Sequence, residues 1–411
     1  MIGKAGLTMS QRRLYVGLDI RNDISQIAVL GPMLQEPEIL EPGGKENGID
    51  YPTRVAVPGT KEYIEGFMEK IYRQEPVMAA GRETDPVNIL AAFFRKILSK
   101  TRKKYPNESI RQLVVTTEYR DYRLIGIIYQ ALSKIGIHRD RAMVIDRRQS
   151  FIYYVMSQKK ELWINQVGVF DYTKDRLMYL QMETDRYKRP MLATVEERDY
   201  SDYIPMFQEK DSTEEEKNSI FEGMVQGAIH GKIITTLYMT GTGFEGGFAG
   251  AVMKKLCVGR HLFQGDNLYV GGACYCAREM SGERRLEEFV YLDEDTVEVN
   301  ISIHAYTDGK PQEILLVRAG TPWHQIDHEI DLIPDGDREL ELNVKNMRTK
   351  DKTKQCIPME GIPGRTDRRA RIGLQLRFAG KEKCIVTVRD KGFGDFYPSS
   401  CRIWEKTITI E

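Results

Sequence analysis

The sequence predicts a mixed α/β part followed by an all-β part. Up to about Arg285, short apolar runs typical of strands alternate with helical patterns of apolar residues, which is characteristic of α/β domains. From Val297 onward, apolar residues recur at every second position, which indicates half-buried strands. A chain of 411 residues also exceeds what one hydrophobic core usually supports, so we expect more than one domain.

Each element of the α/β part is predicted from an apolar run, an apolar stripe or a capping signal. Asp85 and Pro86 are typical of the first turn of a helix, and Gly136 is typical of a helix end. The segment Ser212–Glu216 has the spacing of a capping box, which predicts a helix through residue 230. The predicted strands span 14–20, 25–30, 51–57, 111–117, 142–145, 167–171, 177–182 and 233–239, and further helices are predicted after 85 and 117 and over 149–158 and 273–279.

The all-β part ends in three strands whose inward positions alternate with polar ones. Short turns are predicted at Ala379–Lys381 and Asp390–Gly392, where glycine permits a tight reversal of the chain. The alternating apolar positions are Ile372, Leu374, Leu376, Phe378, Cys384, Val386, Val388, Ile408 and Ile410. This pattern predicts strands with one buried face.

Composition excludes several classes of partner. The 60 acidic and 60 basic residues balance, so no net charge attracts nucleic acid or an anionic membrane. No apolar run approaches the roughly 20 residues that cross a bilayer. Met1–Arg13 lacks a hydrophobic signal core and is interpreted as a short flexible tail. The six cysteines lack C-x-x-C spacing, which favours reduced thiols and a cytoplasmic protein without nucleic-acid or membrane partners.

Candidate phosphate-binding residues follow three predicted strands. Asp19 and Asp171 each end a strand before a polar turn, and Gly241–Gly243 forms a glycine turn after a third strand. Backbone N–H groups in such turns converge on anions, and glycine lets the chain approach closely. An aspartate before a polar turn is also ordinary hairpin chemistry, so a structural role for Asp19 remains the alternative.

The order of these motifs resembles the DnaK-type heat-shock chaperones of the actin-like ATPase superfamily from Leu14 to Ile410. Single motifs are weak, but their order and spacing are specific. The matching segments are Gly17–Ser25 for G-I-D-L-G-T-T-x-S, Tyr51–Val57 for P-S-V-V-A-F, Gly66 with Lys70 for G-D-A-A-K, Val144–Ser150 for I-N-E-P-T-A-A, Met239–Gly243 for V-G-G-S-S, Gly271–Ala273 for A-x-G-A-A, and Phe289–Asp293 for the interdomain linker.

The resemblance implies an architecture and a nucleotide site. It implies an actin-like (ribonuclease-H-like) two-lobed domain over 14–285 split near 166, a linker over 286–295, and a β-sandwich of the peptide-binding type over 296–411. ATP or ADP with Mg²⁺ is the implied cofactor, with Lys70 and Asp171 catalytic and Asp19 and Asp171 holding Mg²⁺ through water. The implied nucleotide-binding residues are Asp19, Arg21, Asn22, Asp171, Thr173, Gly241, Thr242, Gly243, Gly271 and Gly272. A lysine on a charged helix, such as Lys70, is more often a solvated lysine than a catalyst.

The departures from the family pattern concern the phosphate site. Arg21-Asn22-Asp23 replaces Gly-Thr-Thr in the first hairpin, and the glycine run of the second hairpin is lost after Asp171. Arg147 stands where the family has its catalytic glutamate. Bulky and acidic side chains would crowd and repel a triphosphate, whereas Arg21, Lys174 or Arg147 could bind an anion directly. We therefore expect ATP hydrolysis to be weak or lost, as in a pseudo-ATPase.

The β-sandwich carries the expected partner site. By position in the family, the peptide-binding residues are Ile303, Tyr306, Ile330, Ile333 and Leu340. Alternation alone does not distinguish these residues from ordinary core. The chain ends at Glu411 after the last predicted strand, so the helical lid of the chaperones is expected to be missing.

The sequence thus predicts a divergent DnaK-like protein that binds a polypeptide or a protein partner. The first alternative is a functional ATP-dependent molecular chaperone whose altered loops still hold nucleotide. The less favoured alternative is a sugar-kinase-like enzyme, although kinases of this superfamily usually carry their extra elements within the lobes.

Overall fold

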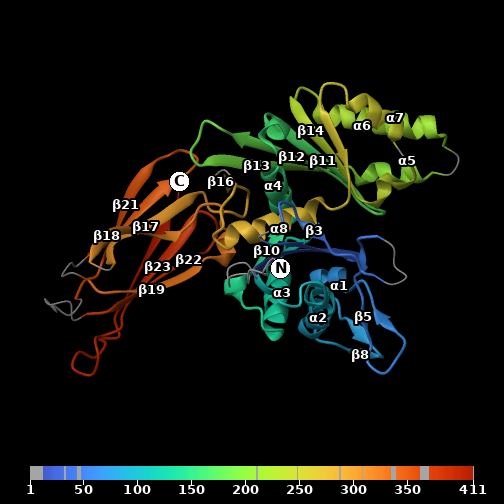
Figure 1. Ribbon diagram of the computed structural model, residues 1–411. Helices are drawn as coiled ribbons and strands as arrows, with labels where there is room; N and C mark the ends of the chain where they lie inside the picture. Colours follow the sequence, from blue (N-terminus) through green and yellow to red (C-terminus); the bar gives the residue numbers. More distant parts are fainter. Residues whose placement is uncertain are drawn as a thin grey trace, which may run out of the picture. The chain divides into compact units, whose positions relative to one another are not determined.

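A computed structural model describes residues 13–31, 34–43, 48–209, 212–247, 249–286, 288–307, 309–334, 339–361 and 370–410 (Figure 1). The expected flexible tail lies outside these residues except for Arg13. The chain divides into two compact units, Met1–Glu183 with Val195–Glu287, and Thr184–Thr194 with Glu288–Glu411. The second unit therefore includes a short piece of chain from the α/β part that the sequence did not assign to it.

The first sheet of the first unit joins parallel and antiparallel strands. Its order is β10-β9-β1-β2-β3, with β4 also paired to β2. β1 is antiparallel to β2 and parallel to β9, which is parallel to β10. The strands are β1 (Arg13–Ile20), β2 (Ile24–Leu30), β3 (Glu38–Ile39), β4 (Tyr51–Pro52), β9 (Ser109–Thr117) and β10 (Ala142–Asp146). The short hairpins β5 (Val55–Ala56) with β6 (Tyr63–Ile64) and β7 (Met78–Ala79) with β8 (Arg82–Glu83) stand apart from this sheet.

Helices α1 (Phe67–Arg73), α2 (Pro86–Lys104) and α3 (Tyr122–Lys134) accompany the first sheet. The capping prediction for α2 is confirmed, because the Asp85 side chain accepts a hydrogen bond from the backbone N–H of Val87. The predicted stripe of α2 is also buried, with Leu90 and Phe94 in the core. These contacts fix the helix against the sheet.

The second sheet of the first unit has the order β15-β14-β11-β12-β13. Its strands are β11 (Gln166–Tyr172), β12 (Leu177–Asp185), β13 (Met191–Asp199), β14 (Ile234–Thr240) and β15 (His261–Gln264). Helices α5 (Ile204–Gln208), α6 (Glu214–Ile229) and α7 (Gly250–Leu256) belong to this half of the unit. The predicted capping box of α6 is present, formed by Thr213 and Glu216. The sequence did not predict β13.

Helices α4 (Arg147–Ser157) and α8 (Leu268–Met280) lie between the two sheets (Figure 1). A Cβ on Gly17 of β1 would clash with the α8 backbone at Val270 and Cys274. A Cβ on Gly272 would overlap the carbonyl oxygen of Ser150 in α4. The predicted start of this helix at residue 273 is therefore wrong: the glycines lie inside α8, where close helix packing requires them.

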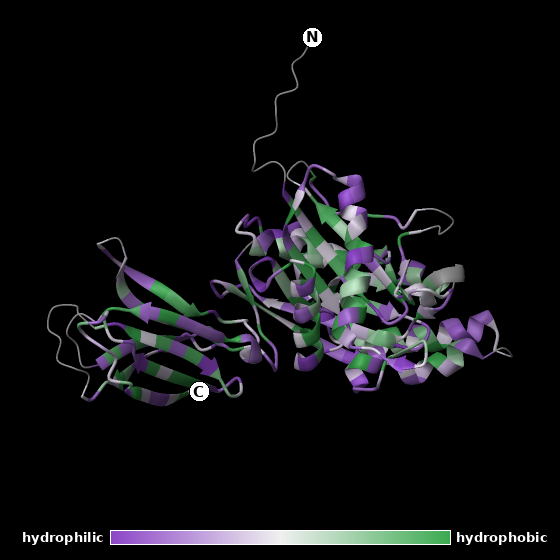
Figure 2. Ribbon diagram, turned by 90° about the horizontal axis from the view of Figure 1, so that it is seen from below, coloured by the Kyte–Doolittle hydropathy of each residue, from purple (hydrophilic) through white to green (hydrophobic). Residues whose placement is uncertain are grey.

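The second unit contains two antiparallel sheets of four strands, in the orders β18-β17-β20-β21 and β19-β22-β23-β24. Both sheets contribute to one hydrophobic core, so the strands form a β-sandwich. The strands are β17 (Val299–Thr307), β18 (Lys310–Val317), β19 (Asp327–Leu332), β20 (Glu339–Asn346), β21 (Lys352–Pro358), β22 (Ile372–Phe378), β23 (Lys383–Asp390) and β24 (Ile403–Thr409). Figure 2 shows the alternation of hydrophobic and hydrophilic residues along them.

The apolar positions predicted in the last three strands are all buried in this core, and the combination of an α/β part with a β part is confirmed. A short strand, β16 (Phe289–Tyr291), lies within the expected linker and pairs with the start of β13. The six cysteines are free thiols. Among the described residues, no helix combines the length and the apolar character needed to cross a membrane.

Candidate functional site

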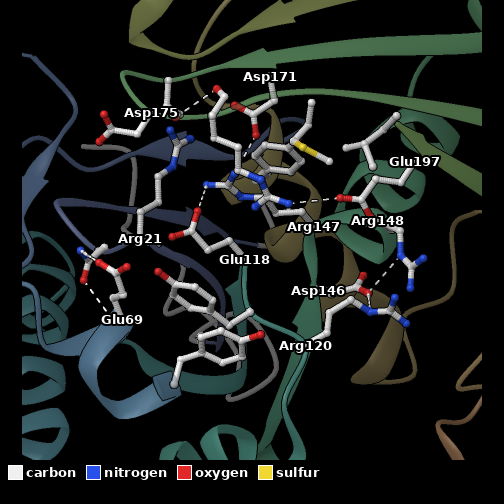
Figure 3. A pocket seen from close by; sticks show the side chains of 18 of the residues that line it. Arg21, Glu69, Glu118, Arg120, Asp146, Arg147, Arg148, Asp171, Asp175 and Glu197 are labelled. Carbon is white, nitrogen blue, oxygen red and sulfur yellow. Dashed lines mark hydrogen bonds and ion pairs between the residues drawn. The ribbon is translucent and has the colours of Figure 1, made fainter. Parts of the chain in front are cut away.

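A cavity of about 580 Å³ opens in the first unit, where the carboxyl ends of β1, β9, β10 and β11 come together (Figure 3). We call this cavity the cleft. Its lining comes from Arg21, Asn22, Asp23, Glu69, Tyr72, Glu118, Tyr119, Arg120, Asp146, Arg147, Arg148, Asp171, Thr173, Lys174, Asp175, Arg176, Met178, Leu180, Glu197 and Tyr269. Strand ends of this kind are the usual ligand sites of open α/β sheets.

Arg147 occupies the centre of the cleft and connects the two sheets. It is the first residue of α4, directly after the N-cap Asp146, whose side chain accepts from the backbone N–H of Gln149. Its Nη1 donates to Asp171 Oδ2 at 2.7 Å, and its Nη2 lies 3.3 Å from Glu118 Oε2. The Arg147 and Asp171 side chains are only 7% and 2% exposed. Because Glu118 follows β9 and Asp171 ends β11, one guanidinium joins both halves of the unit.

Tyr269, near the start of α8, completes the surroundings of Arg147. The guanidinium carbon lies 4.9 Å from the centre of the Tyr269 ring, a cation–π distance. Burial, and then the Asp171 carboxylate, raise the pKa of the Tyr269 hydroxyl well above 10. Tyr269 therefore stays neutral at physiological pH and presents an aromatic face to the cation.

A second buried pair forms between Asp19 and Arg21. The Arg21 Nε donates to Asp19 Oδ2 at 3.0 Å, and the two side chains are 4% and 0% exposed. Burial by itself would lower the pKa of the Arg21 guanidinium, but the Asp19 and Asp171 carboxylates together raise that pKa above the ordinary value. The same balance, with Asp171 and Glu118 as the carboxylates, raises the pKa of Arg147. Both arginines therefore remain charged.

The rim of the cleft repeats this pairing of opposite charges. The Arg120 Nε lies 2.9 Å from Asp146 Oδ2, and the Arg176 Nη2 lies 3.2 Å from Glu197 Oε1 (Figure 3). The lining holds six basic and seven acidic side chains, a formal charge of −1. A nucleoside triphosphate with its several negative charges would therefore meet no excess of positive charge.

The residues of the cleft do not fit a hydrated Mg²⁺ at Asp19 and Asp171. Mg²⁺ binds oxygen ligands, and each of these two carboxylates already accepts from a buried guanidinium. A unit positive charge about 4 Å from another costs about 4 kcal/mol at an effective dielectric constant near 20, and a dication costs about twice that. Among the described residues, no group of three or more His, Cys, Asp or Glu could hold a metal ion.

Some buried polar atoms at this site remain available. Asp19 Oδ1, Asp171 Oδ1, Arg21 Nη2 and Thr240 Oγ1 have no hydrogen-bond partner among the described residues. Buried polar atoms are normally satisfied by water or ligand when the protein does not satisfy them. Of these four residues, Arg21 and Asp171 line the cleft, so the cleft can hold water or a small polar group beside the two ion pairs.

The structure brings four of the sequence-predicted nucleotide residues to the cleft: Arg21, Asn22, Asp171 and Thr173. Asp19 lies fully buried against Arg21. The Asn22 Oδ1 accepts from the backbone N–H of Glu69 at 3.1 Å, so Asn22 connects the β1–β2 turn to α1. Arg21 and Arg147, which the sequence offers as possible binders of an anion, each pair with a carboxylate of the chain itself.

The remaining predicted nucleotide residues lie outside the cleft lining. A Cβ on Gly241 would overlap the carbonyl oxygen of Tyr172, and a Cβ on Gly243 would overlap the Tyr172 ring, so both glycines serve close packing. Thr242 is exposed at the start of a 3₁₀ turn. Gly271 and Gly272 lie inside α8.

On α1, Glu69 lines the cleft and the predicted catalytic Lys70 does not. Lys70 is half-buried, and its carbonyl oxygen accepts from the backbone N–H of Glu75 at 2.8 Å. The sequence analysis also missed Glu118, Tyr269 and the stacked rings of Tyr72 and Tyr119, whose centroids are 4.5 Å apart. Glu118 could have been found, because it directly follows a predicted strand, as Asp19 and Asp171 end theirs.

The five predicted peptide-binding residues of the sandwich fall into two groups. Ile303 and Leu340 are core residues, 5% and 8% exposed, and Ile330 packs against the same core. Tyr306 and Ile333 are 73% and 54% exposed. Of the five, Tyr306 and Ile333 are the exposed ones, and Ile330 is half-buried.

Two family models match the chain. The first, described as "Family of unknown function (DUF5716) C-terminal", matches residues 54–294, more than half of the chain. The second, described as "Domain of unknown function (DUF8552)", matches residues 296–410. No curated protein matches the chain.

Proposed function

The chain belongs to the DUF5716 C-terminal family, and we propose that it is a divergent relative of the DnaK-type chaperones that binds a polypeptide or protein partner without effective ATP hydrolysis. In this proposal, the first unit is a two-lobed actin-like domain. One lobe contains β1, β2, β9 and β10, and the other contains β11, β12 and β14. The sandwich of the second unit contacts the partner.

The observation that supports this proposal most strongly is the position of Arg147. It lies between Asp171 and Glu118, and by the resemblance it stands at the position of the family's catalytic glutamate. In-line phosphoryl transfer needs a cation on the phosphates and an oriented water. A fixed guanidinium between the two carboxylates neutralises them and leaves no general base in that position. The lobes are then held together by a protein side chain instead of by nucleotide.

A functional ATP-dependent chaperone is the second candidate. The volume of the cleft, about 580 Å³, lies within the roughly 300–1,000 Å³ of small-molecule sites and favours this alternative. The unpartnered Oδ1 atoms of Asp19 and Asp171 favour it as well. The formal charge of the lining and the two occupied Oδ2 atoms oppose it.

Calorimetric titration of the purified chain with ATP and Mg²⁺ separates the two candidates. Our proposal predicts no magnesium-dependent heat of binding. Saturable heat that requires Mg²⁺ and disappears in Asp19→Asn would establish a working nucleotide site and favour the second candidate.

Partner binding is tested separately on an array of peptides of varied sequence. We expect the wild-type chain to retain a subset rich in apolar residues, because backbone hydrogen bonds and an apolar pocket are the usual basis of extended-peptide recognition. Tyr306→Ala with Ile333→Ala should weaken that binding. Phe396→Ala is the matched control, since Phe396 is 92% exposed on the connection between β23 and β24 and is not one of the predicted peptide-binding residues. If the Tyr306/Ile333 variant bound the peptides as well as the wild type and the Phe396→Ala control do, Tyr306 and Ile333 would not form part of the peptide-binding surface.

A further inference from the structure

A second cavity of the first unit, of about 610 Å³, lies at the opposite ends of the same strands. It is lined by the starts of β1 and β9, by α2 and by the chain that follows α3. The cleft lies at the carboxyl ends of these strands, so the two cavities are separate. We call this second cavity the basal cavity.

The floor of the basal cavity is apolar. It is formed by Leu14, Leu98, Ile110, Ile135 and Ile137. The volume lies within the roughly 300–1,000 Å³ typical of small-molecule sites, which are mostly apolar with a few polar groups. A ligand with an aliphatic or ring body would therefore fit this floor.

The charged groups of the basal cavity are mostly arginines. Arg95, Arg102 and Arg141 face a single acidic residue, Glu108, which gives a formal charge of +2. Arg95 and Arg102 are seven residues apart on α2, so they lie on one face of the helix about 10 Å apart along its axis. This excess of positive charge contrasts with the cleft, where acidic residues slightly outnumber basic ones.

Two arginines and one buried hydroxyl of the basal cavity have no partner within the described part of the chain. Arg95 and Arg102 are exposed to solvent and form no ion pair with another described residue, so they can pair with an anion, whereas Arg141 donates to the carbonyl oxygen of Gly136 at 2.8 Å. Thr101, which also lines the cavity, is 1% exposed, and its hydroxyl has no hydrogen-bond partner among the described residues. A buried hydroxyl without a partner is unusual unless water or a ligand completes it.

We propose that the basal cavity binds a small amphipathic anion, a carboxylate or phosphate carried on an aliphatic or ring body. The arginines bind the anionic group, and the leucine and isoleucine side chains cover the apolar body. Residues 1–12 of this chain are a poor occupant, because they contain Lys4 and Arg12 but no acidic residue. The proposal does not depend on the function proposed above.

The test uses the fluorescent amphipathic anion 1-anilinonaphthalene-8-sulfonate on the full chain, with decanoate, decyl phosphate, decanol and acetate as competitors. We expect saturable fluorescence that decanoate and decyl phosphate reduce and that acetate and decanol reduce much less. Arg95→Glu with Arg102→Glu should weaken probe binding about tenfold or more. Arg95→Gln with Arg102→Gln should weaken it as well, without a reversal of charge.

Lys96→Glu with Lys103→Glu is the matched control. It makes the same charge change at the same spacing, one residue further along α2, on side chains that do not line the basal cavity. Equal probe binding by wild type and by the Arg95/Arg102 variants would overturn the proposal. Displacement by an acidic, apolar peptide but not by decanoate would overturn it too, because the occupant would then be a polypeptide.

Discussion

Replacement of Arg147 by methionine should destabilise the first unit by about 3–5 kcal/mol, the usual cost of removing one partner of a buried ion pair. Asp171 is 2% exposed and would be left buried without the guanidinium that pairs with it, and Glu118 would lose its partner as well. At a urea m-value of about 3 kcal/mol per M, a loss of about 4 kcal/mol lowers the unfolding midpoint by roughly 1.3 M.

The assay follows urea unfolding by tryptophan fluorescence. The protein has three tryptophans, and only Trp163, which is 3% exposed, belongs to the first unit. A background with Trp323→Phe and Trp404→Phe therefore reports the unfolding of that unit alone. Adding Asp171→Leu to Arg147→Met should recover at least half of the lost free energy of unfolding, because the unpaired buried carboxylate is then removed.

Arg176→Met is the control for this experiment. Arg176 lines the same cleft, but its pair with Glu197 is 36% and 29% exposed, so its loss should cost less than about 1 kcal/mol. If Arg147→Met lowered the midpoint no more than Arg176→Met, or if Asp171→Leu gave no recovery, Arg147 would not join the two sheets as described.

Two further predictions concern packing in each unit. Gly272→Ala should cost about 1–3 kcal/mol or more, because its Cβ would overlap Ser150, whereas Gly223→Ala on α6 has open space and should stabilise by about 0.5–1 kcal/mol in thermal unfolding. Ile303→Ala should cost about 2–5 kcal/mol, whereas the 73% exposed Tyr306 should tolerate alanine within about 0.5 kcal/mol, as measured by urea unfolding with Trp404 fluorescence. If the two substitutions of either pair changed the free energy of unfolding equally, the packing described for that pair would be wrong.

The sequence predicts most of the local structure because local patterns determine it. The stripe of α2, the capping box at Thr213 and the alternation from Ile372 to Phe378 are properties of short segments, and the structure confirms them. The positions of Asp19 and Asp171 at strand ends follow from the same patterns.

The site depends instead on contacts between distant segments. Arg147 pairs with Asp171 and Glu118 because α4 brings it between β9 and β11, which no local pattern reveals. The same holds for Gly272, whose role is set by Ser150, a residue on another helix. The sequence alone does not distinguish a glycine required for helix packing from a glycine that contacts a nucleotide. For this reason the resemblance assigned Gly271 and Gly272 to a ligand.

The most direct test of the cleft is phosphate release from Mg²⁺-ATP by the purified full chain, with and without peptide, compared with Asp171→Asn. We predict that the wild-type chain releases phosphate no faster than this variant, because Arg147 already neutralises the carboxylate that hydrolysis would need. The account would be contradicted if the wild-type chain released phosphate faster than Asp171→Asn in a magnesium-dependent way and if added peptide increased that rate.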